Sequence, residues 1–143
     1  MSLALSDDHK ALADVATDFL NRNNARGHAR RNLDATDETL PPFWAALRDV
    51  GWFGLHLDER YGGSGYGVAE LAVVVEQLGR AIAPGPFVPT VIASAALQAA
   101  APDAMKERVL PRLASGDTIA AIAFGNNIAR SGAPACASDD RIR

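Results

Sequence analysis

The chain has 143 residues, the length of one domain, which excludes a large multidomain enzyme within these residues. Hydrophobic residues make up 48% and charged residues 22% of the sequence, a composition that supports a packed core and excludes general disorder. The formal net charge of -3 excludes nucleic acid or an anionic membrane as the main partner, because either would require a clustered positive field. The apolar residues include 28 alanines but only 5 Phe, 2 Trp and 2 Tyr, which predicts closely packed helices.

Cysteine usage and the first residues together predict a cytoplasmic protein. Cys136 is the only cysteine, so no intrachain disulfide can form and a reducing compartment is favoured. The first ten residues lack the basic region of a secretory signal, and no apolar run approaches the roughly 18 residues of a membrane span. We therefore expect a soluble chain with no membrane partner.

The first helix is predicted over residues 6–22. Ser6 has the character of an N-cap, and Asp7 and Asp8 would meet the positive end of the helix dipole. The helical pattern dissolves over residues 21–39, which we expect to be a polar connection with no more than one short helical turn. A second helix is expected over residues 41–51, because proline is tolerated in a first turn and glycine commonly ends a helix.

The third helix is expected to follow a glycine-dense segment at residues 62–67. It would run from about Val68 to Ala83 with an inward apolar stripe that includes Ile82, and the Pro84-Gly85-Pro86 sequence would end it.

Two further helices complete the predicted bundle. The fourth, over residues 87–100, is apolar nearly all round, which predicts burial on most sides. The fifth covers about residues 104–115 and contains Pro111, whose missing hydrogen bond and ring clash predict a kink or an early end.

Residues 118–124 have the composition of one strand, yet nothing else in the chain has the pattern of a partner strand. We expect residues 125–143 to be a disordered tail, because they contain no aromatic residue and no periodic apolar face. The predicted fold class is all-α: an orthogonal or up-down bundle of about five helices over residues 1–117, followed by a single strand that would begin a β domain.

The residues alone show no catalytic centre. The glycine-dense segment is a weak phosphate-loop candidate, since a GxGxxG spacing from Gly63 would place glycine where Val68 stands, and a tight structural turn is favoured. His9, His28 and His56 lie on different segments without metal-ligand spacing, so no metal site is expected.

Three sequence motifs nevertheless occur in an order that indicates a family resemblance. They are GWFGLHLDERYGGSG at residues 51–65, VVVEQLGR at residues 73–80 and RVLPRLASG at residues 108–116. Together they resemble the N-terminal helical domain of the acyl-CoA dehydrogenase family, over about residues 5–124.

The resemblance implies a larger enzyme. In this family an N-terminal helical, a middle β-barrel and a C-terminal four-helix domain together bind FAD and an acyl-CoA thioester, which is desaturated between its α and β carbons. The catalytic glutamate lies in the C-terminal domain, so no catalytic residue is expected in this chain, which alone should be inactive and bind no cofactor. An electron-transfer flavoprotein as partner and a homo- or hetero-oligomer are also implied, and residues 118–124 would be the first strand of the middle domain.

Site residues follow from matching the LPRLASG motif. The resemblance places acyl-contacting positions at about residues 84–95, and its candidates for lining the acyl pocket are Phe87, Val88, Val91 and Ala95. The alternative that these residues are simply helix core is equally open, because an acyl tail and a neighbouring helix both require apolar contacts.

The implied cofactor-binding residues are Phe124 and Gly125. The family carries a Thr-Glu-Pro pattern directly after the first barrel strand, whereas this chain has Gly125, Asn126 and Asn127 there. The departure is compatible with a fragment of a dehydrogenase or with a non-catalytic subunit of a heteromeric dehydrogenase from the steroid-degrading branch. A third hypothesis is a small helical interaction module, and the acyl group could be short, long, branched or steroidal.

Overall fold

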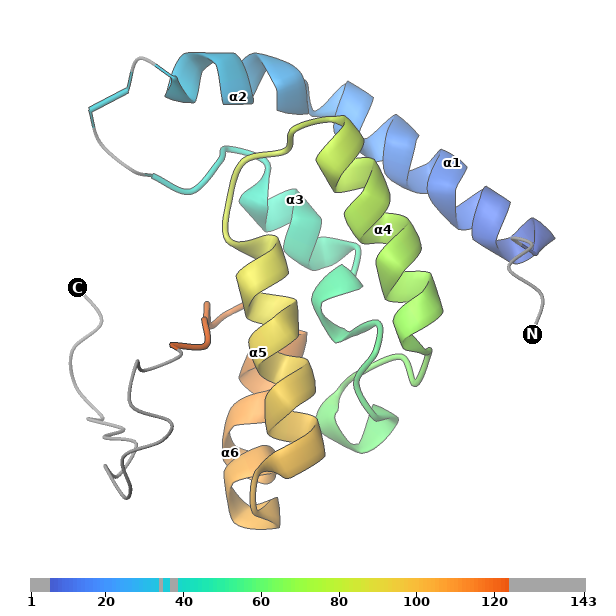
Figure 1. Cartoon of the computed structure of the whole chain (residues 1–143), viewed down its shortest axis with the longest axis vertical. Helices are drawn as coiled ribbons and strands as arrows, with labels where there is room; N and C mark the ends of the chain where they lie inside the picture. Colours follow the sequence, from blue (N-terminus) through green and yellow to red (C-terminus); the bar gives the residue numbers. More distant parts are fainter. Residues whose placement is uncertain (1–5, 34, 37–38, 124–143) are drawn as a thin grey trace.

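A computed structural model describes residues 6–33, 35–36 and 39–123 (Figure 1). Within those residues the protein is helical and has no strand, which confirms the all-α fold class. The α-helices are α1 (Asp7–Arg22), α2 (Ala25–Asn32), α3 (Trp44–Asp49), α4 (Val68–Arg80), α5 (Phe87–Ala100) and α6 (Asp103–Ala114). Two 3-10 helices, η1 (Trp52–Gly54) and η2 (Glu59–Tyr61), lie between α3 and α4.

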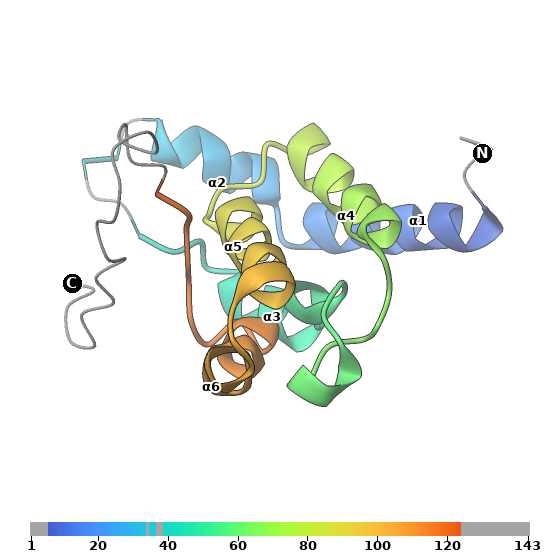
Figure 2. The ribbon, with the colours of Figure 1, turned by 60° about the horizontal axis from the view of Figure 1, so that its bottom comes forward.

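The helices pack in two main pairs, α1 with α4 and α5 with α6, which lie side by side in Figures 1 and 2. A larger apolar cluster fills the space between α1, α3, η1, α4 and α5, and Phe53 and Val74 are almost completely buried in it. A smaller cluster joins α6 to the chain around η2 through Leu57, Tyr61 and Leu110. The side chain of Phe53 also contacts Phe87 of α5, so α5 is in contact with the larger cluster at its first residue.

The predicted N-terminus of α1 is confirmed. The Ser6 hydroxyl accepts from the backbone N–H of His9, and His9 Nδ1 accepts from the backbone N–H of Ser6, which is a reciprocal capping box. At the start of α4, the Glu70 carboxylate accepts from the Gly67 N–H at 2.9 Å. His9 Nε2 and Glu70 Oε1 lie 3.2 Å apart, so the two capping side chains join the N-terminal ends of α1 and α4.

Helix α2 was not predicted, since residues 25–32 were expected to be mostly loop. Its sequence, ARGHARRN, has one buried residue, Ala25, and therefore no apolar stripe for a periodicity argument to detect. Alanine and arginine are strong helix formers, so the intrinsic helix propensity of this segment could have predicted α2.

Two helix ends also differ from the prediction. Helix α4 ends at Arg80, and Ile82 takes a positive φ of 52° and is 69% exposed, so its predicted inward position is wrong. A kink or an early end was predicted at Pro111, and the early end is wrong, because helix α6 continues through Pro111 to Ala114. Pro111 lies in the last turn, where one lost backbone bond is offset by the complete burial of Leu110 and Leu113.

The predicted strand is not formed over residues 118–123, which have no regular secondary structure. A strand requires a partner for its backbone groups, and the described residues provide none. Instead the Thr118 N–H donates to the Arg112 carbonyl, and the Ala120 N–H donates to the Thr90 hydroxyl. The expected tail, residues 125–143, lies outside the described residues. In the described part of the chain, no helix combines the length and apolar character needed to cross a bilayer.

Candidate functional site

Helix α5 carries all four residues predicted to line an acyl pocket. Phe87 and Val91 are buried at 4% and 2% exposure, and the Phe87 ring packs against the Phe53 ring at a centroid distance of 4.9 Å. These two side chains therefore belong to the core of the domain. Val88 is 38% exposed and Ala95 is half-buried, so the structure divides the four candidates between two sides of the helix.

The side of α5 that carries Val88 is apolar and exposed. We call it the outer face of α5, and it consists of Val88, Pro89, Ile92, Ala96 and Ala99. Ile92 is 52% exposed, so the expectation that α5 is buried on most sides is wrong. Sequence reasoning did not select Ile92, because an apolar helix carries no signal for which side its neighbours leave uncovered.

The opposite side of α5 is held by buried polar groups. Ser94 is 1% exposed, and its hydroxyl donates to the Val91 carbonyl and lies 3.0 Å from His56 Nε2. Because the hydroxyl hydrogen is used, Nε2 must carry the hydrogen of the ring, which makes Nδ1 the acceptor nitrogen. Burial lowers the pKa of His56, and the nearby Val91 carbonyl opposes that effect in part. His56 is therefore a neutral core histidine.

Further along α5, Gln98 also holds the helix to the chain after η1. Its side-chain oxygen accepts from the Asp58 N–H at 2.8 Å, and its amide nitrogen donates to the His56 carbonyl at 3.3 Å. Among the residues that the structure describes, His56 Nδ1 has no hydrogen-bond partner, so the His56 and Ser94 pair there lacks the carboxylate of a hydrolytic triad. Sequence reasoning missed these contacts because the partners lie about 40 positions apart in the chain.

The glycine-dense segment folds onto the chain around η1. The N–H groups of Ser64, Gly65 and Tyr66 donate to the carbonyls of Gly54, Leu57 and Leu55 at 2.9–3.0 Å. A phosphate would require free N–H groups at this position, and these are already used. The geometry is that of a structural turn, as the sequence favours.

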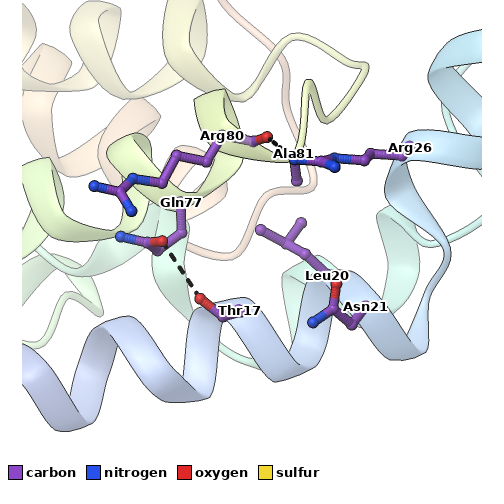
Figure 3. Close-up of a pocket in the computed structure, with 7 residues that line it drawn as sticks. All are labelled: Thr17, Leu20, Asn21, Arg26, Gln77, Arg80 and Ala81. Atoms are coloured by element: carbon purple, nitrogen blue, oxygen red, sulfur yellow. Dashed lines mark hydrogen bonds between the residues drawn. The ribbon is translucent and has the colours of Figure 1, made fainter.

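Two cavities lie beside α1 and α4, and neither of these two contains a predicted acyl-lining residue. The first, of about 290 Å³, lies between α1, the start of α2 and the end of α4 (Figure 3). Arg26 donates to the Arg80 carbonyl at 2.8 Å, while the Arg80 guanidinium pairs with Glu76. Thr17 bonds to Gln77 across the cavity at 3.3 Å. These polar groups therefore connect the helices to one another.

The second cavity, of about 240 Å³, lies beside the joined ends of α1 and α4. Its lining residues are Ser6, Asp8, His9, Leu12, Leu55, Tyr66 and Glu70. The pKa of Glu70 is lowered, first by the hydrogen bond from its own backbone N–H and then by those from His9 and Gly67. The carboxylate therefore remains ionised and caps α4. Within the residues that the structure describes, no group of three or more His, Cys, Asp or Glu side chains is placed to hold a metal ion.

The predicted cofactor-binding residues Phe124 and Gly125 lie outside the described residues. The segment that leads to them contacts α5 at Thr90, the residue between Val88 and Ile92 on the opposite side of the helix. The outer face of α5 and the contact with Ala120 thus lie on the same helix.

This helical arrangement has a known counterpart. A family model described as the N-terminal domain of acyl-CoA dehydrogenase matches residues 6–117. The chain belongs to the acyl-CoA dehydrogenase family, of which these residues form the N-terminal helical domain.

Two curated relatives illustrate the relationship. Acyl-CoA dehydrogenase IpdE2 of Mycobacterium tuberculosis is 43% identical over 88 residues, which cover 60% of this chain and 26% of the relative. The mitochondrial isovaleryl-CoA dehydrogenase of Pongo abelii is 31% identical over 127 residues, which cover 84% of this chain and 29% of the relative. The chain therefore spans less than a third of either protein.

Two solved structures have the same fold. The ChsE4-ChsE5 complex of Mycobacterium tuberculosis gives a TM-score of 0.73 at 23% identity, covering 83% of this chain and 33% of that chain. The G363A variant of the Tcur3481-Tcur3483 steroid acyl-CoA dehydrogenase gives a TM-score of 0.67 at 25% identity, covering 77% and 30%. Both match this chain as one portion of a longer protein.

Proposed function

We propose that the chain is the N-terminal portion of a flavin-dependent acyl-CoA dehydrogenase, which removes hydrogen from the α and β carbons of an acyl-CoA thioester. The outer face of α5 would form one wall of the acyl pocket. The observation that carries the proposal is the exposure of Val88 and Ile92 on a helix whose other side is held by buried bonds.

An acyl wall must be both apolar and rigid, and α5 has both properties. Val88, Ile92 and Ala96 follow one another at four-residue spacing and present only hydrocarbon. Burying exposed apolar surface against an acyl tail stabilises the complex by about 25 cal/mol per Å². Because His56 and Gln98 join α5 to the chain after η1, the helix presents this face without further ordering.

The other components belong to the complete enzyme. We propose FAD as its cofactor, with Phe124 and Gly125 as flavin contacts, an electron-transfer flavoprotein as electron acceptor, and an oligomeric cytoplasmic assembly. The N–H groups of Ser64, Gly65 and Tyr66 are bonded to neighbouring carbonyls, so these three groups are not available to a flavin phosphate. We expect the chain alone to bind no flavin and to have no activity, because the family's catalytic glutamate lies in another domain.

A chimera tests the proposal. Residues 6–123 of this chain would replace the matching segment of isovaleryl-CoA dehydrogenase, which keeps its own flavin loop and remaining domains. We expect the chimera to purify with flavin and to reduce an electron acceptor when an acyl-CoA is added. Failure of a folded chimera to bind flavin or to turn over any acyl-CoA in a chain-length series would contradict the proposal.

The acyl wall itself is tested by Ile92→Asp in the same chimera. Ile92 is 52% exposed, so the substitution should leave folding intact while raising KM for acyl-CoA about tenfold or more. The matched control is Val15→Asp in α1, which is similarly exposed at 55% and lies on a different helix. Equal effects of the two substitutions on KM would exclude α5 as a wall of the pocket.

A second candidate function is a non-catalytic subunit of a heteromeric dehydrogenase. It is favoured by the Gly125, Asn126 and Asn127 sequence, and the two solved structures described above are named as pairs of proteins. A longer chimera that includes residues 6–127 distinguishes the two candidates. Loss of flavin binding in the longer chimera, with recovery in its Gly125→Thr, Asn126→Glu, Asn127→Pro variant, would support the non-catalytic subunit. Flavin binding without these changes would support the catalytic one.

A further inference from the structure

A group of exposed arginines lies where α1 ends and α2 follows it. Residues 19–33 contain four arginines and no acidic residue, in a chain whose formal net charge is -3. All four are exposed, and we call them the arginine patch: Arg22, Arg26, Arg30 and Arg31. The structure shows ion pairs for Arg48, Arg60 and Arg80, whereas no carboxylate among the described residues lies within ion-pair distance of the patch.

The packing of α2 does not account for these charges. Ala25 is the one buried residue of this helix, so α2 has no apolar stripe and no internal ion pair to stabilise it. Arg26 lies in the first turn, where the helix dipole is positive and a cation is unfavourable, and Asn24 makes no side-chain capping bond there. The positive charge of the patch is therefore available to an anion from outside the domain.

The first cavity lies at the base of the patch (Figure 3). Its volume is about 290 Å³, and Arg26, Asn21 and Gln77 are among its lining residues. Arg26 uses Nη2 to bond the Arg80 carbonyl, so its other guanidinium N–H groups keep their capacity to donate. Gln77 uses its side-chain oxygen to accept from Thr17, which leaves its amide nitrogen as a donor. Charged and amide donors around one cavity suit a carboxylate ligand.

We propose that the arginine patch and this cavity form a docking site for an acidic segment of a partner protein. One carboxylate of the segment enters the cavity beside Arg26, and a second pairs with Arg30. These two arginines lie four residues apart on one helix, so carboxylates about 6 Å apart would face both of them. The docking site lies on α1, α2 and α4, whereas the proposed acyl wall lies on α5.

The charge around the patch limits the size of the partner's acidic segment. Helix α1 also carries four aspartates, and Asp18 lies one turn before Arg22. Figure 1 shows α2 continuing from the end of α1, so a nucleic acid or an anionic membrane would cover both helices and be repelled by α1. A short acidic segment contacts the patch alone, because charges more than about 8 Å away are largely screened at physiological ionic strength.

An NMR titration with a designed peptide tests the docking site. The probe is an alanine-based peptide of about 14 residues with glutamate at every fourth position, and its matched control has glutamine there. The glutamate peptide should shift the amide signals of Arg26, Arg30 and Gln77 saturably and bind at least about fivefold more tightly than the glutamine peptide. An increase from about 50 to 300 mM NaCl should weaken its binding severalfold. Equal binding of the two peptides would overturn the inference.

Arg30→Gln and Arg112→Gln form a matched pair of variants. Both arginines are exposed, so both variants should fold, and both lose one positive charge. Arg30→Gln should weaken binding of the glutamate peptide about twofold to fivefold, whereas Arg112→Gln on α6 should change it by less than about twofold. Equal weakening would show a general effect of net charge and would overturn the docking site.

The cavity is tested by Arg26→Gln and by Asn21→Asp. Arg26→Gln removes the proposed carboxylate partner but also the bond to the Arg80 carbonyl, so its fold is checked by circular dichroism. Asn21→Asp leaves that bond in place and adds a negative charge to the cavity, which keeps the test valid if Arg26→Gln fails to fold. Each should weaken peptide binding about threefold or more. Unchanged binding in Asn21→Asp would overturn the role of the cavity.

Two further measurements distinguish other occupants of the patch. A short DNA duplex and phosphatidylserine vesicles should bind more weakly than the glutamate peptide, and tighter binding of either would assign the patch to a polyanion and overturn the inference. Asp34, Asp37 and Glu38 follow α2 in the sequence. The Asp34→Asn, Asp37→Asn, Glu38→Gln variant should bind the peptide within about twofold of wild type. A gain of about tenfold or more would assign the patch to the chain's own acidic residues and overturn the partner.

Discussion

One added methyl group at Gly63 tests how the glycine-dense segment packs. An ideal Cβ on Gly63 would overlap the backbone carbonyl of Leu57 and lie 2.7 Å from the Leu57 Cβ. Real Cβ atoms essentially never approach other atoms closer than 3.0 Å. The obstacle is backbone and not the end of a flexible side chain, so Gly63→Ala requires the two chain segments to separate.

The energetic consequence follows from the bonds between those segments. The Gly65 N–H donates to the Leu57 carbonyl, and the Ser64 and Tyr66 N–H groups donate to neighbouring carbonyls at similar distances. Each such bond contributes about 0.5–1.5 kcal/mol net, so loss of two or three would lower the free energy of unfolding by roughly 1–4.5 kcal/mol. That is a large part of the roughly 5–15 kcal/mol that stabilises a typical domain.

Denaturant unfolding followed by far-UV circular dichroism measures this loss, with Gly79→Ala as the matched control. Gly79 lies inside α4, and a Cβ there would meet nothing within 4 Å. Alanine should therefore stabilise that helix by about 0.5–1 kcal/mol. If Gly63→Ala unfolds within about 0.5 kcal/mol of wild type while Gly79→Ala behaves as expected, the proposed close packing of the segment is refuted.

Two further predictions concern the core and its pH dependence. Leu110→Ala should lower the free energy of unfolding by about 2–5 kcal/mol, because Leu110 is completely buried. The control Ile92→Ala, on the outer face of α5, should lower it by less than about 1 kcal/mol. Equal losses for the two variants in denaturant unfolding would contradict the assigned burial. His56 has a lowered pKa, so the unfolded chain binds a proton that the folded chain excludes as pH falls below about 6.5. Stability should therefore fall from pH 7 toward pH 5 more steeply in wild type than in His56→Gln, and parallel stability curves would show that His56 is not the cause.

The sequence predicted those helix ends that are set by a few neighbouring residues. Ser6 with Asp7 and Asp8 marked the start of α1, because a cap acts over one helical turn. Glycine and proline marked the limits of α4 and α5 to within three residues. By contrast, the polar helix α2 lacked an apolar stripe, and Pro111 was tolerated because of the burial of its neighbours in α6.

The candidate acyl-pocket residues on α5 likewise include a part that the sequence predicted and a part that it did not. Its location on α5 follows from the order of motifs along the chain, but the sequence does not separate Phe87 and Val91 from Val88 and Ile92. All four are apolar, and their exposure depends on which sides the other elements cover. The core aromatic Phe53 covers Phe87, whereas no described element covers Ile92 to the same extent.

By itself the sequence determined the helical class, the main helices and the family, since these depend on composition, local spacing and the order of motifs. Only the tertiary structure decided which face of α5 is exposed and that Thr90 holds Ala120, because both depend on contacts between residues far apart in the chain. The predicted strand shows the same limit. Residues 118–123 have the composition of a strand, but a strand forms only where a second strand completes its hydrogen bonds.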